Sequence, residues 1–219
     1  MNDIRKTIGW GDYSWNPVTG CEGNCWYCYV KRFKDYDRTP TFHPERLNQP
    51  FGVKKSKKIF VCSTADLFAT WVKDDWRWEV MNIVKQIPQH TFQFLTKHPL
   101  GYRGIYFPSN CHLGLTMDHF TPIELALFKQ TELEENNLKF ISFEPLMEPM
   151  PGEELLSGID WVIIGALTGP GAADYKPKLH WIEQILKQAD KYALPVFMKD
   201  NLKDSWAGEL RQEFPKAGK

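Results

Sequence analysis

The sequence predicts an α/β fold in which about six to seven parallel strands form a partial, open TIM-like barrel with flanking helices. Three observations support this class. Short β-rich runs recur along the chain, helical patterns lie between several of them, and most runs are almost continuously apolar. Continuous apolar runs are typical of parallel strands, because both faces of such strands are buried. A full eight-unit barrel has about 250 residues. The chain has 219 residues, which favours an incomplete barrel.

Six runs are predicted to be strands of this sheet, and one further strand is expected before the cysteines near the N-terminus. The runs are KIFVCS from Lys58, TFQFLT from Thr91, CHLGLT from Cys111, KFISFE from Lys139, DWVIIG from Asp160 and LPVFMK from Leu194.

Helical patterns follow several of these strands. One helix is predicted to bury a face made of Trp76, Val80, Ile83, Val84 and Ile87. A second begins at Thr121, where TPIE places Glu124 in position for a capping box. A third buries Leu179, Ile182, Ile185, Leu186 and Ala189. The connections after residues 96 and 144 are short, so the pattern leaves open whether helices fill them.

The composition of the chain limits its possible domain organisation and its possible binding partners. There is no repeat, low-complexity tract or linker, so residues 1–219 are expected to form a single domain. Basic and acidic residues both number 27, so any contact with nucleic acid would have to be local. Neither a signal peptide nor a membrane span is visible, which predicts a cytoplasmic protein without a membrane partner.

Polar residues follow the predicted strands at their carboxyl ends, the edge that carries the chemistry in parallel α/β folds. They are Ser63, Thr64, Asp66, Thr96, Lys97, Thr116, Asp118, Glu144, Thr168, Lys199 and Asp200. Several have structural alternatives. Asp66 could cap a helix, and Thr116 and Asp118 could contact a ribose or end a strand in an ordinary turn. Lys97, Glu144 and Lys199 could be solvated surface charges.

The segment TGCEGNCWYCYV places Cys21, Cys25 and Cys28 within eight residues. In a reducing compartment such a cluster indicates metal binding or catalysis rather than disulfides. Three thiols can hold an iron–sulfur cube and leave one iron open. Zinc would need a fourth ligand, for which His43 is the nearest candidate, and simple structural use is the other alternative. Cys62 and Cys111 lie in apolar runs and are expected to be small core residues, with a hydrogen-donor role as the alternative.

This cysteine spacing, with Tyr27 directly before the last cysteine, resembles the signature of the radical S-adenosylmethionine enzymes. That superfamily uses a partial barrel with its cluster loop after the first strand. A closer resemblance, to the phage Gp37/Gp68 family, a domain of unknown function, covers nearly the whole chain. The segments that carry it are WNPVTGC, CYV, STADLF, FQFLTKHP, LGLTMD, FEPLM, WVIIGALTGPGA and VFMKDN, in that order. The chain departs from that family in two places. The first of the three cysteines lies further from the second in the family, and the family has Gly-Glu-Ser-Gly at Ala166–Gly169.

The resemblance implies two cofactors, a 4Fe-4S cluster on Cys21, Cys25 and Cys28, and S-adenosyl-L-methionine on the open iron. One electron delivered to the sulfonium would release methionine and a 5′-deoxyadenosyl radical that abstracts hydrogen from a substrate. An external one-electron reductase of the flavodoxin or ferredoxin type is then needed. The residues expected to bind S-adenosylmethionine are Tyr27, Ser63, Thr64, Asp66, Thr116, Asp118, Gly165 and Thr168.

The substrate stays open at this stage. STADLF also resembles the corresponding stretch of spore photoproduct lyase, which repairs thymine lesions in DNA, so DNA repair or nucleotide modification is one alternative. A small-molecule or protein substrate is another. A nonenzymatic, metal-stabilised binding module is the alternative from a different functional class.

Overall fold

The structure is a computed structural model, and it describes residues 1–131 and 137–216. Within those residues eight strands form one sheet, in the order β1-β2-β5-β6-β7-β8-β9-β10, and β3 pairs with β4 in a separate ribbon. The strands are β1 Asn2–Asp3, β2 Tyr13–Trp15, β3 Val18–Thr19, β4 Thr41–Phe42, β5 Lys58–Val61, β6 Thr91–Thr96, β7 Cys111–Thr116, β8 Leu138–Phe143, β9 Trp161–Ile164 and β10 Val196–Met198.

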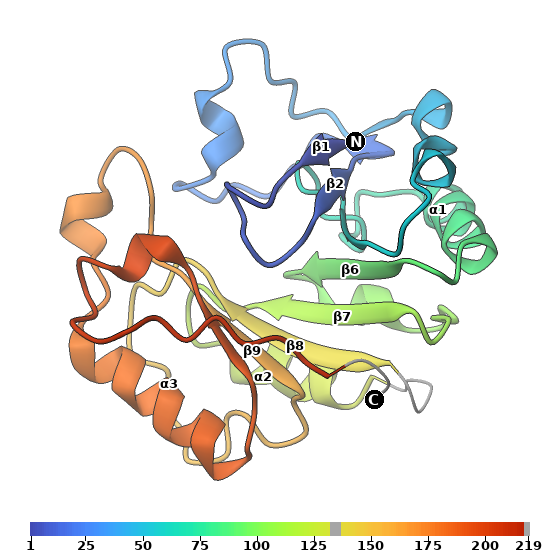
Figure 1. The fold of residues 1–219 in the computed structure, drawn as a ribbon. Helices are drawn as coiled ribbons and strands as arrows, with labels where there is room; N and C mark the ends of the chain where they lie inside the picture. The colour runs from blue at the N-terminus through green and yellow to red at the C-terminus, as the bar shows by residue number, and fades with distance from the viewer. Residues whose placement is uncertain (132–136, 217–219) are drawn as a thin grey trace.

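From β2 to β10 each neighbouring pair in the sheet is parallel, and only the short β1 runs antiparallel to β2. The sheet curls into a half-barrel (Figure 1). The predicted α/β class and open barrel are therefore confirmed. Each of the six predicted runs contains a strand of this sheet, and β2 is the strand expected before the cysteines.

The three predicted helices are present as α1 Asp74–Gln86, α2 Pro122–Lys129 and α3 Leu179–Lys191. The connections after β6 and β8 contain no α-helix among the described residues. Short 3-10 helices lie at Tyr29–Arg32, Pro44–Arg46, Gln49–Gly52, Pro99–Tyr102, Ala172–Tyr175 and Asp200–Leu202.

The capping box predicted at the start of α2 is wrong. Thr121 precedes the helix, but its side chain makes no capping hydrogen bond. The first turn is instead closed by the backbone, where the Leu125 amide donates to the Thr121 carbonyl oxygen at 3.0 Å. Glu124 is one of the residues that line a cavity beside the helix.

The two faces of the sheet carry separate apolar clusters, because alternate residues of a strand face opposite sides. Residues such as Val61, Phe94 and Leu113 face outward and pack with the buried sides of the three helices. The intervening residues face the inside of the half-barrel, where Trp10, Phe60, Phe140, Trp161 and Phe197 form the second cluster. The Trp10 ring lies 4.7 Å from Phe60 and 5.9 Å from Phe140, centroid to centroid.

Gly114 in β7 makes room for this inner cluster. A Cβ atom at this position would lie 2.3 Å from Cζ of Phe140, which is fully buried. Glycine therefore lets the ring of Phe140 cross the neighbouring strand.

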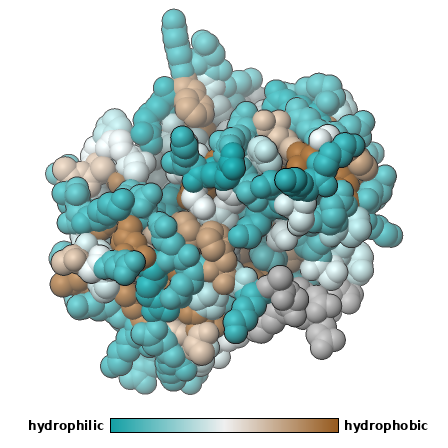
Figure 2. All heavy atoms as spheres, in the orientation of Figure 1, coloured by the Kyte–Doolittle hydropathy of each residue, from teal (hydrophilic) through white to brown (hydrophobic). Residues whose placement is uncertain are grey.

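No helix within the described ranges is long and apolar enough to span a membrane. Figure 2 shows hydrophilic residues over most of the visible face, with apolar residues in separate areas between them.

Gly114→Ala should lower the free energy of unfolding by about 1–3 kcal/mol, because the added methyl group forces Phe140 out of its packed position. Urea unfolding measures the difference. The matched control is Gly52→Ala, since a Cβ at Gly52 meets nothing within 4 Å. Equal stability of the Gly114 variant and wild type would contradict this account of the inner face.

Candidate active site

The three clustered cysteines lie on a loop of residues 20–40, the cysteine loop, whose ends are joined by the β3–β4 ribbon. Val18 pairs with Phe42, and Thr19 pairs with Thr41. Gly20 has φ +83°, and a Cβ there would lie 2.1 Å from the Thr39 carbonyl oxygen. Only glycine allows the two strands to approach so closely. The loop therefore leaves and rejoins the fold at one narrow point.

Arg38 fixes the part of the loop that carries the first cysteine. Its Nη2 donates to the carbonyl oxygens of Glu22 and Gly23 at 3.0 and 3.1 Å. Its Nε donates to the carbonyl oxygen of Cys21 at 3.4 Å. The guanidinium thus supplies donors to consecutive backbone acceptors that lie outside regular secondary structure.

Two tyrosine hydroxyls attach the loop to the carboxyl end of β5. Tyr29 donates to the Ser63 carbonyl oxygen at 2.6 Å, and Tyr36 donates to the Thr64 carbonyl oxygen at 2.8 Å. Burial raises the pKa of Tyr29, and it raises the pKa of Tyr36 to about 12. Both hydroxyls therefore remain protonated donors near neutral pH. Figure 1 shows the loop on the side toward which the arrowheads of β6 and β7 point.

A third tyrosine joins the loop to β6 and β7 through two charged side chains. The Tyr27 hydroxyl donates to Oδ2 of Asp118 at 2.6 Å, and Lys97 Nζ lies 2.7 Å from Oδ1 of the same carboxylate. Lys97 also donates to the Tyr27 oxygen. Each of these residues is a separate candidate in the sequence, and the structure brings Tyr27, Lys97 and Asp118 into one hydrogen-bonded group.

The charges in this group are partly buried. The Asp118 side chain is 10% exposed and that of Lys97 is 30% exposed. Burial opposes ionisation of Asp118, but the Lys97 charge and the hydrogen bonds from Lys97 and Tyr27 outweigh it. They lower the pKa of the carboxyl below its ordinary 3.8. Asp118 is therefore an ionised acceptor at neutral pH.

Asp66 connects the ends of β5 and β6. Its Oδ1 accepts from Thr96 Oγ1 at 2.6 Å and from the Phe68 amide at 3.2 Å, and its Oδ2 accepts from the Lys97 amide at 2.9 Å. Three protein donors thus already satisfy much of this carboxylate. Asp66 closes a turn rather than capping a helix, because α1 begins eight residues later at Asp74.

Next to Asp66, Ser63 and Thr64 surround the side chain of Asn16. The amide oxygen of Asn16 accepts from Ser63 Oγ at 3.2 Å and from the Thr64 amide at 3.4 Å. The Thr64 hydroxyl is buried yet has no hydrogen-bond partner in the described part of the chain. A buried hydroxyl without a partner is costly, so it marks a position where a bound group could supply one.

At the other end of the sheet, Lys199 after β10 forms an ion pair with Glu144 after β8. Gly165, at the end of the intervening β9, makes this possible. A Cβ there would lie 3.0 Å from Cδ of Lys199 and 3.2 Å from Cδ of Glu144. The two charges are 14% and 26% exposed, so they are partners across the sheet edge rather than separate surface charges.

The chain after β9 also reaches the cysteine loop. Arg32 Nη2 donates to the Thr168 carbonyl oxygen at 3.3 Å, and the rings of Trp26 and Tyr175 lie 4.7 Å apart. Asn201 holds the beginning of this segment, accepting from the Ala166 amide at 3.0 Å and donating to its carbonyl oxygen at 2.8 Å.

Thr116 takes part in none of these contacts, although it lies at the same edge. It is half-buried at the end of β7 and pairs in register with Ser142 of β8, whose buried hydroxyl has no partner within the described residues.

The thiols of Cys21, Cys25 and Cys28 are free and half-buried. Burial raises the pKa of Cys21; the backbone near Gly23 opposes this, and Asp66, Cys25 and Cys28 are close enough to raise it further. Among the residues that the structure describes, no group of three or more His, Cys, Asp or Glu side chains is arranged to hold a metal ion. Ligation by these cysteines therefore stays a prediction.

The other candidates for metal or thiol chemistry have structural explanations. His43 Nε2 lies 2.8 Å from Thr19 Oγ1, and its Nδ1 lies 3.3 Å from Glu45, so the ring is engaged beside the β3–β4 ribbon. Cys62 and Cys111 are buried, and burial raises the pKa of Cys62 to about 12 and also raises that of Cys111. Both are core thiols that stay protonated near neutral pH.

Residues that sequence reasoning did not single out complete this site. Asn16 orients the end of β5, Arg32 and Arg38 hold the cysteine loop, and Asn201 holds the segment after β9. Asn16 and Asn201 lie inside WNPVTGC and VFMKDN, two of the segments that carry the family resemblance, and that position could have identified them as candidates. Their targets lie in distant segments, which a single sequence does not reveal. Asn201 bonds to the backbone of Ala166, and Asn16 bonds to the Ser63 hydroxyl and the Thr64 amide.

A protein family described as "Protein of unknown function (DUF5131)" matches residues 5–212. The chain belongs to this family. The match does not carry the Gp37/Gp68 name that the sequence resemblance suggested. No curated protein matches the chain in sequence.

Several solved structures of spore photoproduct lyase are similar in fold. A Tyr-to-Phe variant matches with a TM-score of 0.59 and 11% identity, over 90% of this chain and 78% of that chain. A double variant with bound AdoMet and dinucleoside spore photoproduct matches with a TM-score of 0.53 and 12% identity, over 85% and 62%. A Cys-to-Ser variant matches with a TM-score of 0.55 and 13% identity, over 84% and 63%. This chain thus spans less than two thirds of the last two proteins, and at these identities the similarity concerns the fold.

Lys97→Met should lower the free energy of unfolding at pH 7 by about 1–3 kcal/mol, because the Asp118 carboxylate loses its counter-charge while staying nearly buried. The folded-state pKa of Asp118 lies below its ordinary 3.8. Its ionised form therefore adds stability above that pH, and the contribution is lost as the pH falls through the folded-state pKa. Urea unfolding at several pH values should show the difference between the proteins narrowing below pH 3.8.

The control is Lys176→Met, whose ion pair with Asp204 is exposed on both sides, at 53% and 76% of the two side chains. Such a pair contributes at most about 1 kcal/mol. Equal losses in the two variants would contradict a special contribution from Lys97.

Proposed function

We propose that this chain is an enzyme of the radical S-adenosylmethionine superfamily, in which Cys21, Cys25 and Cys28 bind a 4Fe-4S cluster. The observation that carries the proposal is the placement of the cysteine loop. It follows the first parallel strand of a half-barrel, and contacts from Tyr27, Tyr29, Tyr36 and Arg32 attach it to the segments after β5, β7 and β9. Chemistry in parallel α/β folds is located at this edge.

The residues present suit these cofactors in number and kind. Three cysteine thiols can bind three irons of a cube and leave the fourth for another ligand. Beside them, the unpartnered Thr64 hydroxyl offers a polar contact to a bound molecule. When bound, the cluster and S-adenosylmethionine together supply reductive cleavage of the sulfonium and hence a carbon radical that abstracts hydrogen.

The residues of the chain have separable tasks in this proposal. Asp66 and Asp118 place carboxylates near the cofactor, where an ammonium or a ribose hydroxyl would find acceptors. Lys97 and Tyr27 hold Asp118 in position. Ser63, Thr64, Thr116, Gly165 and Thr168 supply short polar groups or space along the same edge.

The structural neighbours support the proposal, because one of the similar spore photoproduct lyase structures has AdoMet and dinucleoside spore photoproduct bound. A nucleotide-containing substrate is consistent with that likeness. The proposal also requires an external one-electron reductase of the flavodoxin or ferredoxin type, which fits a cytoplasmic enzyme.

Single replacement of Cys21, Cys25 or Cys28 by Ala should prevent formation of an intact cube, because each thiol is assigned to a different iron. Cys62→Ala and Cys111→Ala are the matched controls and should keep full iron and sulfide, since both thiols are buried in the core. Iron and sulfide analysis after anaerobic reconstitution measures this. A full cluster in the Cys25 variant would refute the ligand assignment, and preferential zinc binding by wild type would favour a nonenzymatic metal-stabilised module.

The variant Thr64→Val tests whether the Thr64 hydroxyl forms a hydrogen bond to the cofactor or has only a structural role. Without cofactor, the variant should be more stable than wild type by up to about 1–3 kcal/mol, because a buried hydroxyl without a partner is removed. Its affinity for S-adenosylmethionine should fall about two- to tenfold, because one neutral hydrogen bond is lost. Urea unfolding and equilibrium dialysis of the reconstituted protein measure the two effects.

The control is Thr131→Val, because the Thr131 hydroxyl already donates to the Leu127 carbonyl oxygen at 3.3 Å. This variant should lose stability without losing cofactor affinity. Unchanged affinity in the Thr64 variant would place its hydroxyl outside the cofactor site.

A further inference from the structure

A cavity of about 600 Å³ opens beside the candidate active site. It lies between the segment after β5, which contributes Phe68 and Val72, the segment after β6, which contributes Lys97 and His98, and helix α2, which contributes Glu124 and Leu127. Its volume is within the range of small-molecule sites, which are mostly apolar and carry a few converging polar groups.

Two contacts connect the walls of this cavity with the cysteine loop. Lys97 lines the cavity and at the same time bonds to Tyr27, the neighbour of Cys28. His98 lines it and meets the Trp71 ring edge-on, with centroids 5.0 Å apart. The far side of the Trp71 ring lies 3.7 Å from where a Cβ would stand on Gly23. A ligand in the cavity is therefore separated from the cysteine loop by single side chains.

Not every charged side chain around the cavity has a partner of opposite charge. Arg77 is paired with Asp74 at 2.5 Å, and Lys97 is paired with Asp118 at 2.7 Å. Lys73 and Glu124 also line the cavity, and neither side chain forms a hydrogen bond or an ion pair with another side chain among residues 1–131 and 137–216. The Lys73 ammonium lies over the Trp76 ring, 5.4 Å from its centroid. One cation and one hydrogen-bond acceptor are thus available to a ligand.

The chemistry of the walls narrows the class of that ligand. A purely apolar molecule would leave the Glu124 carboxylate desolvated without a partner. A small inorganic anion would meet the like charge of Glu124 and leave the apolar walls uncovered. The ligand needs an apolar, flat or bulky body, a donor for Glu124 and a negative group for Lys73. A nucleotide whose base carries an amino group has all three.

We propose that this cavity binds the substrate of the enzyme as a nucleotide, with the amino edge of the base at Glu124 and the phosphate at Lys73. This inference rests on the proposed function. The residues expected to bind S-adenosylmethionine do not line the cavity; they are Tyr27, Ser63, Thr64, Asp66, Thr116, Asp118, Gly165 and Thr168. Substrate and cofactor therefore occupy neighbouring sites, with Lys97 between them.

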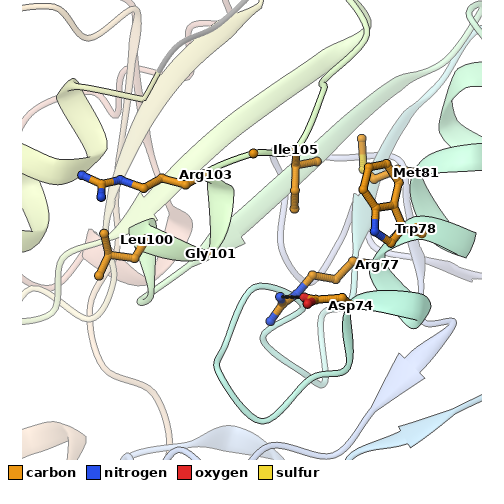
Figure 3. Close-up of a pocket in the computed structure, with 9 residues that line it drawn as sticks. Asp74, Arg77, Trp78, Met81, Leu100, Gly101, Arg103 and Ile105 are labelled. Atoms are coloured by element: carbon orange, nitrogen blue, oxygen red, sulfur yellow. Dashed lines mark hydrogen bonds and ion pairs between the residues drawn. The ribbon is translucent and has the colours of Figure 1, made fainter.

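A smaller cavity of about 230 Å³ continues this surface (Figure 3). It shares Asp74, Arg77 and Leu100 with the larger one and adds Trp78 and Arg103. Trp78 is 54% exposed, so it offers a ring face for stacking, and Arg103 offers a cation. A strand that continues beyond the bound nucleotide would find these two groups. The ligand can therefore be a free nucleotide or one nucleotide of a single strand, and the experiment distinguishes them.

Isothermal titration calorimetry on the full chain, without a cluster, tests binding independently of radical chemistry. The probes are the monophosphates of cytidine, adenosine, guanosine and uridine, together with cytidine, leucine and a short single-stranded oligonucleotide. At least one amino-bearing monophosphate should bind about tenfold more tightly than uridine monophosphate, because one base-edge contact to Glu124 is missing in uridine. Cytidine without its phosphate should bind more weakly than its monophosphate.

Two variants test the proposed contacts of Glu124 with the base and of Lys73 with the phosphate. Glu124→Gln should remove most of the preference for the amino-bearing base, and Lys73→Gln should reduce the advantage of the monophosphate over the nucleoside. Glu183→Gln, on helix α3 and away from both cavities, should bind as wild type does. Tighter binding of the oligonucleotide, reduced by Trp78→Ala, would identify a nucleic-acid strand as the source of the nucleotide, and equal binding a free nucleotide.

Several results would overturn the inference. They are no binding of any nucleotide, tighter binding of leucine than of every nucleotide, unchanged preference in Glu124→Gln, or displacement of the nucleotide by S-adenosylmethionine in simple competition. Because these measurements need no cluster, the inference can fail while cluster binding by the cysteines succeeds, and the reverse outcome is equally recognisable.

Discussion

Parallel pairing of neighbours from β2 to β10 brings the carboxyl ends of these strands to one edge of one sheet. Residues far apart in the chain, such as Asp66, Asp118 and Lys199, are placed at this edge for that reason alone. The order depends on filling both faces of the sheet. Helices cover the outer face, and inside the half-barrel large aromatic rings meet, with Gly114 leaving the space that Phe140 occupies.

The cysteine loop is held over this edge by directed contacts rather than by an apolar core. Gly20 allows its two ends to meet, Arg38 binds carbonyl oxygens along its backbone, and the hydroxyls of Tyr27, Tyr29 and Tyr36 reach the sheet. These hydrogen bonds are exposed or partly buried, and a typical hydrogen bond contributes only modestly to the free energy of unfolding. They therefore fix the position of the loop more than they stabilise the fold, which is what a site for a reactive cofactor needs.

The sequence predicted the sheet well because most of the predicted strands are almost continuously apolar and the helices show a clear period. It also identified the polar residues that follow the strands. The partners of those residues depend on register and strand order, which one sequence does not reveal. The ion pair of Glu144 with Lys199 forms across Gly165, which directly follows the intervening strand β9. The capping box failed for a similar reason, because Glu124 satisfies a local pattern but lines a cavity built by two other segments.

The central claim is that the cysteine loop binds a cluster with an open iron that accepts S-adenosylmethionine. Electron paramagnetic resonance of the anaerobically reconstituted and reduced wild-type protein, recorded with and without S-adenosylmethionine, tests it most directly. The account predicts the signal of a reduced 4Fe-4S cluster whose spectrum changes when S-adenosylmethionine is added. Absence of a cluster signal, or a signal that S-adenosylmethionine leaves unchanged at saturating concentration, would contradict it.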